Sequence, residues 1–327
     1  MLIDGVACPA CHGTLSQREQ ALACSACGRL YPIVLGIPDL RLTPDPWIGM
    51  ADDRDKAIAV MAASPPGFEA AVRTYWERTP DTPPHLAARF IEHVLDAKRR
   101  SGEWLALLPA AIPGERWLDL GCGTADLACA APDGVDVVGV DVAFRWLAIA
   151  QRRLKEAHCE AALVCGNAES LPFAAGWFDR VIGLGVAEHC EDIGAVLAEA
   201  HRVLRPGGSL YLRTVNRYSL LAEPHVGLWG VGWLPRTWAD AYVRWRGGAG
   251  YQHHWPHGAR ALHAALRRAN FAESRVDAAP LLPSESRRLP SAVRWTVPLY
   301  HQFRKVPLAS SIARTFAPLL DVTAAVR

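Results

Sequence analysis

The fold is decided by residues 117–126, WLDLGCGTAD. The first four are typical of a short buried strand, and Gly121 and Gly123 follow it directly. Glycines without side chains let the backbone approach a ligand closely at the end of a strand. A dinucleotide site would need the spacing Gly-x-Gly-x-x-Gly, which residues 126–128 do not supply. The turn therefore predicts a ligand site without identifying the ligand.

Downstream of this turn, short apolar strands alternate with helical segments. Such alternation is typical of a parallel sheet with crossover helices. We therefore expect an α/β fold with a doubly wound, Rossmann-like sheet. The strands located by pattern are 117–120, 135–140, 161–165, 180–184, 209–215 and 271–278.

A second acidic position, at the end of the next strand, limits the class of ligand. Asp141 ends the second strand, twenty-two residues after Asp119. An acidic side chain there is placed to accept hydrogen bonds from both hydroxyls of a ribose. The sequence thus predicts a nucleoside at this strand edge.

The sequence here resembles the class I S-adenosylmethionine-dependent methyltransferases. The family's pattern apolar-Asp-apolar-Gly-Cys-Gly-Thr-Gly recurs at 118–125, with Ala125 in place of the third glycine. We interpret this departure as mild, because alanine also permits close packing. Residues 166–173, 177–182 and 204–208 resemble later motifs of the family in the same order. The resemblance implies S-adenosylmethionine as cofactor and a mostly parallel sheet of seven strands.

The resemblance also implies the cofactor-binding residues. Gly121 and Gly123 would lie beside the methionine part, Asp141 on the ribose, and Asn167 and Ala168 at the adenine edge. Asn167 stands where the family usually has Asp. The full set of expected cofactor contacts is Tyr75, Asp119, Gly121, Cys122, Gly123, Asp141, Val142, Asn167, Ala168, Glu169 and Glu188.

Near the N-terminus, Cys8 and Cys11 are separated by twelve residues from Cys24 and Cys27. Two CxxC pairs supply four thiolates, which close a tetrahedral structural zinc site and leave no position for a substrate. The segment resembles the small zinc-ribbon activator of tRNA and release-factor methyltransferases. We expect a structural zinc ion with no chemical role.

Two other functions remain open. A zinc ribbon before a methyltransferase also resembles large-subunit rRNA guanine methyltransferases, so the ribbon would dock RNA or protein. Against nucleic acid, the ribbon balances three acidic with three basic residues. The second alternative is a non-catalytic subunit that binds the cofactor and activates a partner.

Composition excludes several classes. Half of the residues are hydrophobic and 21% are charged, which is typical of a globular protein. A net charge of +2 provides no chain-wide field for nucleic acid. Charged residues interrupt every apolar run, and the residues before the first CxxC pair lack the pattern of a signal peptide, so we expect neither a membrane-spanning helix nor a signal peptide. The other five cysteines are isolated, so we expect free thiols and a cytoplasmic location.

The acceptor is expected in residues 216–256, which are rich in Trp and His and follow the fifth strand. Their aromatic side chains would wall an apolar pocket or cap a small core. The candidate general bases are His189, His225, His253 and His254. A second metal site is disfavoured, because no carboxylate or cysteine lies at a short helical spacing from them. The expected acceptor is a small, partly apolar molecule: a lipid, quinone-like compound or secondary metabolite, methylated on a hydroxyl or carbon.

The expected domains are a zinc ribbon (1–42), a linker with N-terminal helices (43–109), the methyltransferase domain (110–280, insertion 216–256) and a basic extension (281–327). The extension holds seven basic and two acidic residues. Basic residues with interleaved aromatics favour peripheral contact with an anionic membrane. Nothing in the sequence indicates an oligomeric state.

Overall fold

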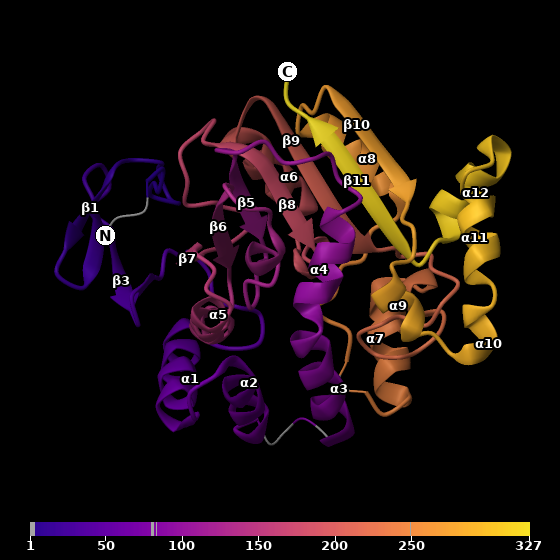
Figure 1. The fold of residues 1–327 in the computed structure, drawn as a ribbon, viewed down its shortest axis with the longest axis horizontal. Coiled ribbons are helices and arrows are strands. Elements are labelled where there is room, and N and C mark those ends of the chain that lie inside the picture. The colour runs from indigo at the N-terminus through magenta and orange to yellow at the C-terminus, as the bar shows by residue number, and fades with distance from the viewer. Residues whose placement is uncertain (1–3, 80–81, 83, 249) are drawn as a thin grey trace. The chain divides into compact units, whose positions relative to one another are not determined.

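A computed structural model describes residues 4–79, 82, 84–248 and 250–327. It begins with a small antiparallel sheet, indigo in Figure 1, in which strands pair in sequence order. Leu15, Leu22 and Cys24 face inward and are buried, so this sheet has a core of its own. We call residues 4–42 the ribbon. Its strands are β1 (Leu15–Arg18), β2 (Ala21–Cys24), β3 (Leu30–Val34) and β4 (Ile37–Pro38).

The main sheet contains seven strands within the described residues, in the order β10-β11-β9-β8-β5-β6-β7. β5 pairs in parallel with β6 and β8, and β6 with β7, whereas β11 runs antiparallel to both β9 and β10. The expected α/β fold with a mostly parallel seven-stranded sheet is confirmed. The strands are β5 (Arg116–Leu120), β6 (Asp136–Asp141), β7 (Ala162–Cys165), β8 (Phe178–Leu184), β9 (Leu204–Val215), β10 (Glu273–Ala278) and β11 (Leu319–Ala325).

The chain divides into two compact units. The N-terminal unit comprises Met1–Ile182 and Arg202–Arg205, and the C-terminal unit comprises Gly183–His201 and Pro206–Arg327. The expected ribbon and linker thus share a unit with β5, β6 and β7. The expected extension, 281–327, shares a unit with β9 and β10. It supplies β11, which pairs with both of these strands, so the extension is part of the main sheet.

The ribbon is joined by backbone hydrogen bonds to the edge of the main sheet within the N-terminal unit. Leu40 N donates to Cys165 O at 2.7 Å, and Ala7 N donates to Pro172 O at 2.9 Å. An edge strand leaves a row of backbone groups unpaired. The ribbon therefore satisfies part of the β7 edge.

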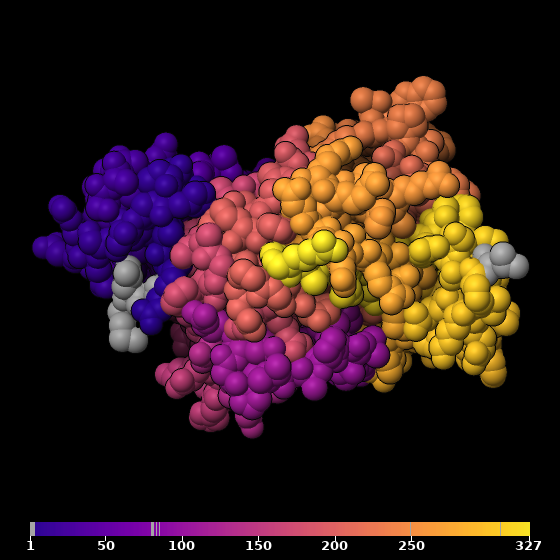
Figure 2. Space-filling model, turned by 90° about the horizontal axis from the view of Figure 1, so that it is seen from above, coloured from indigo at the N-terminus to yellow at the C-terminus, as the bar shows by residue number. Residues whose placement is uncertain are grey.

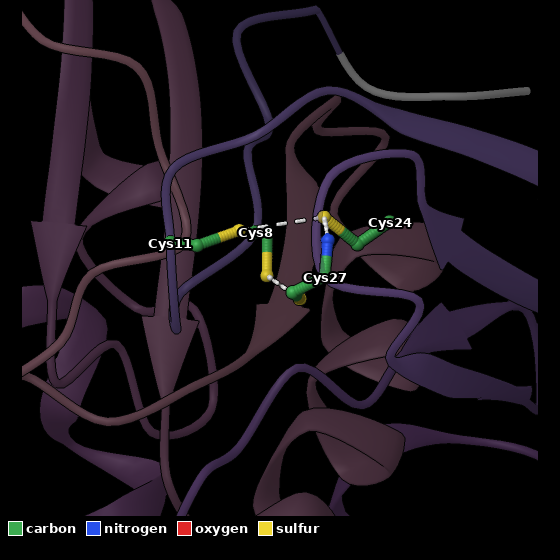
Figure 3. A group of neighbouring side chains, drawn as sticks. All are labelled: Cys8, Cys11, Cys24 and Cys27. Atoms are coloured by element: carbon green, nitrogen blue, oxygen red, sulfur yellow. Dashed lines mark hydrogen bonds between the residues drawn. The ribbon is translucent and has the colours of Figure 1, made fainter.

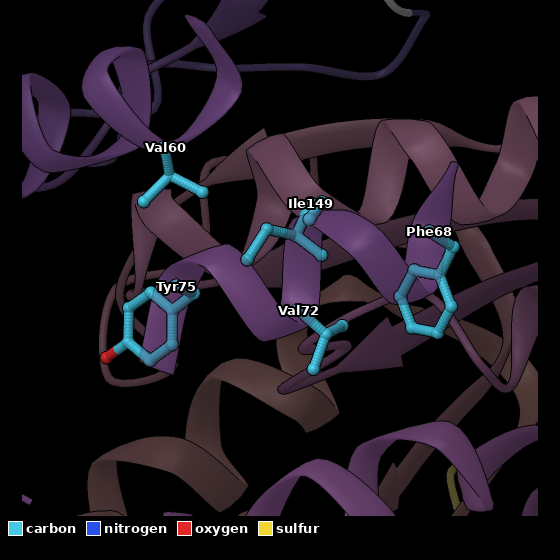
Figure 4. Close-up of a cluster of buried hydrophobic side chains, with 6 residues drawn as sticks. Val60, Phe68, Val72, Tyr75 and Ile149 are labelled. Atoms are coloured by element: carbon cyan, nitrogen blue, oxygen red, sulfur yellow. The ribbon is translucent and has the colours of Figure 1, made fainter. Parts of the chain in front are cut away.

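Helices of the linker pack on a helix of the main fold (Figure 4). Val60, Phe68, Val72, Tyr75 and Ile149 form a buried apolar cluster. These residues come from α1 (Met50–Ala63), α2 (Phe68–Glu77) and α5 (Phe144–Glu156). Among the described residues, the linker's other two helices are α3 (Pro84–Leu95) and α4 (Ala97–Leu105).

The C-terminal unit holds the insertion, which has a small core made of Val231, Ala239, Val243 and Tyr251. Of the two interpretations for its aromatics, the small core is the one this cluster matches, since Trp229, Trp238 and Trp245 are exposed. The remaining helices are η2 (Ala187–His189), α6 (Ile193–Val203), η3 (Val231–Trp233), α7 (Arg236–Trp245), α8 (Ala259–Arg268), α9 (Pro283–Arg287), α10 (Ser291–Arg294), α11 (Val297–Phe303) and α12 (Pro307–Phe316). Among the described residues, no helix combines the length and apolar character needed to cross a bilayer.

Candidate functional site

A tight turn after β5 forms the centre of the candidate site. Gly121 and Gly123 have φ values of +71° and +49°, a left-handed backbone that favours glycine. The N–H groups of Gly121 and Cys122 both donate to Val140 O, at 2.9 and 3.0 Å, which ties the turn to the end of β6. A side chain at Gly123 would meet no atom within 4 Å. The space beside the backbone of Gly123 is therefore open, so a ligand could lie directly on the turn.

One feature of this turn, the backbone at Ala125, differs from expectation. Ala125 has a φ of +56°, so the position of the family's third glycine requires backbone freedom as well as small size. After the turn the chain forms the three-residue 3₁₀ helix η1 (Ala128–Ala130).

Asp141 holds the turn through its carboxylate. Oδ2 accepts a hydrogen bond from Gly123 N and Oδ1 accepts one from Ala143 N, both at 2.8 Å. Burial raises the pKa of Asp141 above the ordinary range, although these two backbone donors oppose the shift. Because each carboxylate oxygen offers more than one acceptor site, Asp141 keeps capacity for ligand hydroxyls.

Asp119, on β5 just before the turn, is a buried carboxylate with an unsatisfied atom. It is 3% exposed, and its Oδ2 has no hydrogen-bond partner. Burial, and then the charges of Asp126 and Asp141, raise the pKa of Asp119 well above its ordinary value. A buried acceptor without a donor is costly. A cationic group bound beside the turn would satisfy it.

Asn167, which follows β7, is bound to the linker. Its Oδ1 accepts from Leu42 N at 2.8 Å and from Thr43 N at 3.2 Å, and its Nδ2 donates to Thr43 Oγ1 at 2.9 Å. Ala168 and Glu169 come next and are partly exposed. The contact of Asn167 with adenine stays a prediction, because its side chain here positions residues 42–43.

A buried ion-pair network joins the end of the ribbon to the loop after β6. Arg41 contacts Asp39 at 2.7 Å and Asp53 at 2.8 Å, and its Nη1 also donates to Val142 O at 2.9 Å. Arg145 contacts the same Asp53 at 2.9 Å. Asp39 is near Arg41 in sequence, but Val142 lies 101 residues from Arg41 and Arg145 lies 92 residues from Asp53, so no local pattern predicts the network.

Tyr75 lies in the cluster of α1, α2 and α5. Its ring packs on Trp146 with centroids 4.5 Å apart, and the ammonium of Lys56 lies over the ring. Its contact with a cofactor stays a prediction, while its packing role is evident.

The four ribbon cysteines converge, with their sulfur atoms pointing toward one another (Figure 3). All four lie within 4.8 Å of one another. Cys27 N donates to Cys24 Sγ at 3.5 Å, and this hydrogen bond lowers the pKa of Cys24 to about 6. Four thiol ligands in a closed group fit one tetrahedral zinc ion.

Three of the four candidate histidines converge in the C-terminal unit. The ring centroids of His189 and His225 are 4.8 Å apart, and those of His225 and His254 are 4.5 Å apart. Burial, followed by the charges of the other histidines, lowers the pKa of His254 to about 3. The ring of His253 packs instead near Trp255, with centroids 6.2 Å apart.

Glu188 has a different environment from the one expected for a cofactor ligand. Its carboxylate is buried and accepts a hydrogen bond from Thr214 Oγ1 at 2.7 Å, and its backbone O accepts one from Trp255 N at 2.7 Å. These contacts hold two loops of the C-terminal unit together. A cofactor contact by Glu188 stays a prediction.

Comparison with known proteins assigns the family. A methyltransferase-domain family matches residues 118–212, and a Trm112p-like protein family matches residues 1–36. The chain is 30% identical over 180 residues to a ubiquinone biosynthesis O-methyltransferase of Methylobacterium sp. (strain 4-46). The aligned region covers 53% of this chain and 72% of that protein. The chain belongs to the class I S-adenosylmethionine-dependent methyltransferases.

Two other relatives align with smaller shares of this chain and of their own length. A ubiquinone biosynthesis O-methyltransferase of Bradyrhizobium sp. (strain ORS 278) is 34% identical over 45% of this chain and 58% of that protein. The biotin biosynthesis bifunctional protein BioHC of Cellvibrio japonicus is 34% identical over 48% of this chain and 29% of that protein. The chain thus spans less than two thirds of these two relatives. Haemonchus contortus phosphoethanolamine N-methyltransferase 2, solved with S-adenosyl-L-methionine, is 19% identical over 70% of this chain and 52% of that chain, with a TM-score of 0.48.

Family membership gives this methyltransferase S-adenosylmethionine as its cofactor, and the residues present fit it. The unsatisfied Asp119 Oδ2 suits the methionine ammonium, and the open space beside Gly123 suits a ligand lying on the turn. Glu223, which contacts His225, was missed by the sequence analysis. Its position two residues before that histidine is the one local signal that pointed to it.

Proposed function

We propose that this protein transfers the methyl group of S-adenosylmethionine to a small, partly apolar acceptor. The observation that carries the proposal is the buried, unsatisfied carboxylate of Asp119 beneath the Gly121–Gly123 turn. A ligand without a hydrogen-bond donor at this place would leave that carboxylate unpaired. A ligand with an ammonium group would pair it, and such pairs are among the stronger hydrogen bonds in proteins.

When bound, the cofactor supplies a sulfonium methyl group that is displaced in line by the acceptor. The chain's own residues then have mainly a positioning task, because alignment of the reacting atoms carries most of such a step. We assign the ammonium to Asp119, the ribose to Asp141 and the methionine backbone to Gly121 and Gly123. The remaining expected contacts, those of Tyr75, Cys122, Val142, Asn167, Ala168, Glu169 and Glu188, are part of this proposal.

We propose a hydroxyl or acidic carbon as the methylated group. The support is that two similar proteins carry the name ubiquinone biosynthesis O-methyltransferase. Such acceptors must lose a proton. The candidate bases are His189, His225, His253 and His254, and the rings of His189, His225 and His254 lie together. Burial lowers the pKa of His254 to about 3, which makes His254 a weak base.

The alternative, an RNA or protein methyltransferase docked through the ribbon, is supported by the Trm112p-like match. Against it stands the use of ribbon backbone groups within the chain, where Ala7 and Leu40 already donate to residues 172 and 165. We therefore assign the ribbon to the chain's own fold, with one structural zinc on Cys8, Cys11, Cys24 and Cys27. Thiolate ligands suit a reducing compartment, so we propose a cytoplasmic location.

We further propose that the C-terminal helices contact anionic membranes. Trp295, Leu299 and Phe303 follow one another at intervals of four residues and are 86%, 71% and 41% exposed. Lys305, which is exposed, comes two residues after Phe303. The surface of this segment is yellow in Figure 2. Exposed apolar side chains with adjacent cations suit the interface of a bilayer.

Sedimentation with lipid vesicles tests this contact. The chain should bind phosphatidylserine vesicles at low salt more strongly than phosphatidylcholine vesicles, and Leu299→Ser should weaken the binding. Trp229→Ser, at an exposed tryptophan outside the helices, is the matched control. Equal binding to both lipids would refute the electrostatic part.

Titration calorimetry with S-adenosylmethionine and S-adenosylhomocysteine tests the main function. We expect both to bind and Asp119→Asn to weaken both. Turnover of catechol-like and quinol-like hydroxyls should follow. Binding without turnover on any acceptor would favour the non-catalytic activator, and no binding by a folded, zinc-loaded sample would refute the proposal.

A further inference from the structure

The histidine cluster of the C-terminal unit has the composition and geometry of a metal site. His189 ends η2, while His225 and His254 lie in two separate parts of the insertion, so the three are remote in sequence. One ring nitrogen from each comes within 4.8 Å of the other two. Three nitrogens that lie no more than 4.8 Å from one another have a common centre at most about 2.8 Å from each of them. A Zn–N bond is about 2.0–2.1 Å, so shifts of less than about 1 Å would complete the site.

A carboxylate orients one of these rings. His225 Nδ1 lies 2.6 Å from Glu223 Oε1. Because a carboxylate only accepts, Nδ1 donates the hydrogen and Nε2 keeps its lone pair. Metal-bound histidines are commonly held in this way by a carboxylate on the other nitrogen. Glu223 is itself fixed, since its Oε2 accepts from His225 N at 2.8 Å and from Val226 N at 3.0 Å.

The backbone holds the other two histidines beside each other. Trp255 N donates to Glu188 O at 2.7 Å, which joins the residue after His254 to the residue before His189. The ring of Tyr251 stacks on His254 at 5.1 Å with an angle of 9° between the planes. The rings are thus positioned by fixed neighbours, as a preorganised ligand set requires.

The donor set indicates the class of metal. Imidazole suits Zn²⁺, Fe²⁺, Co²⁺, Ni²⁺ and Cu²⁺, whereas Mg²⁺ and Ca²⁺ prefer oxygen. Three protein ligands leave one coordination position open, as in catalytic rather than structural zinc sites. The absence of a ligand pair at helical spacing, which disfavoured a second metal at the sequence level, does not matter here, because the ligands come from three separate segments.

We propose that His189, His225 and His254 bind one divalent transition-metal ion, with Zn²⁺ as the first candidate, at a site distinct from the four cysteines. Its open position takes an oxygen ligand. If the proposed methyl transfer to a hydroxyl is correct and that hydroxyl binds the metal, the three histidines would act as ligands in place of bases. The bound oxygen would lose its proton to water more readily, since zinc lowers the pKa of bound oxygen ligands. That second step rests on the proposed function, but the metal site does not.

Metal analysis of the full chain tests the site. After zinc loading and desalting, the wild-type chain should hold two equivalents. His189→Ala, at an exposed position, and His225→Ala should each hold one. His253→Ala is the matched control and should hold two. A wild-type chain with one equivalent, or histidine variants that keep two, would overturn the site.

Cobalt substitution and affinity give independent readouts. Co²⁺ in the histidine site should add visible absorption without thiolate charge transfer, and this band should persist in Cys24→Ser but disappear in His189→Ala. Glu223→Gln should weaken zinc binding about 10–100-fold in competition with a chromophoric chelator. A cobalt band lost only with the cysteines would contradict the proposal.

The same samples separate this inference from the proposed function. Calorimetry with S-adenosylmethionine on each variant reports the cofactor site alone. Normal cofactor binding with one metal equivalent would refute the histidine site and leave the methyltransferase proposal intact. Two metal equivalents without cofactor binding would support the histidine site and refute the methyltransferase proposal.

Discussion

The buried carboxylate of Asp119 lowers the stability of the fold, and we propose that it binds the ammonium group of the cofactor. Its carboxylate is buried, with Oδ2 unpaired, and its pKa is raised by burial and by the nearby Asp126 and Asp141. A carboxyl whose folded-state pKa is raised binds more protons in the folded state than in the unfolded state. The free energy of unfolding therefore falls as pH rises from the unfolded pKa of about 3.9 toward the folded value.

Asp119→Asn should separate these two effects. We expect the free energy of unfolding at pH 7 to rise by about 1–2 kcal/mol, because the uncompensated charge is gone. The fall in stability above about pH 4 should become shallower. Affinity for S-adenosylmethionine should drop by about 1.5–3 kcal/mol, the range for a hydrogen bond to a charged group. Urea denaturation at several pH values and calorimetry measure both. A variant that loses stability, or keeps its affinity, would contradict this role.

Asp141 should behave differently, because its carboxylate is already bonded. Asp141→Ala removes the acceptor of Gly123 N and Ala143 N as well as the proposed ribose acceptor. We expect cofactor affinity to fall by about 1–3 kcal/mol and stability to fall too. Asp141→Asn keeps one acceptor oxygen and should lose less of both. Unchanged affinity in the alanine variant, measured by calorimetry, would end the ribose assignment.

At the scale of elements, the buried ion pairs join the ribbon's end to α1 and to the loop after β6. Arg41 is fully buried between Asp39 and Asp53. Its removal would leave two buried carboxylates with less compensation, so Arg41→Ala should lower the free energy of unfolding by about 3–5 kcal/mol. Arg73→Ala, which breaks an exposed pair with Glu69, is the matched control and should cost less than about 1 kcal/mol. Equal effects in denaturation experiments would show that burial does not set the cost.

The elements also show what the sequence could predict. The turn after β5, the strands β5 to β10 and the four-cysteine cluster depend on local patterns of period, glycine spacing and CxxC, and all were predicted from the sequence. β11 was not located, although Leu320, Val322 and Ala324 are buried in alternation. Its place between β9 and β10 is set by pairing with strands remote in sequence.

The histidine cluster has the same limit. His189 and the insertion were both identified from the sequence, but the backbone contact between Glu188 and Trp255 that brings them together joins residues far apart in the chain. The ion-pair network of Arg41 could not be predicted from the sequence for the same reason. Local patterns predict which residues carry chemistry, whereas long-range contacts decide which of them meet.

For the molecule as a whole, zinc in the ribbon should affect more than the ribbon. The ribbon's strands have two to five residues each, too few to be stable without the metal. Its backbone also donates hydrogen bonds to Cys165, the last residue of β7, and to Pro172. Loss of zinc should therefore unfold the ribbon and expose an edge of the main sheet, and exposed edges promote association between chains.

Cys24→Ser tests this coupling. We expect the variant to hold one metal equivalent fewer than the wild-type chain, to melt at a lower temperature and to aggregate with a concentration dependence visible by light scattering. Cofactor affinity should fall as well, because residues 41–43 contact Val142 and Asn167 beside the site. Cys159→Ser, at a partly exposed cysteine outside the ribbon, is the control and should change none of these. A Cys24→Ser chain with full metal content would contradict the four-cysteine site. One that loses the metal yet keeps wild-type melting and cofactor affinity would show that the ribbon folds apart from the rest of its unit.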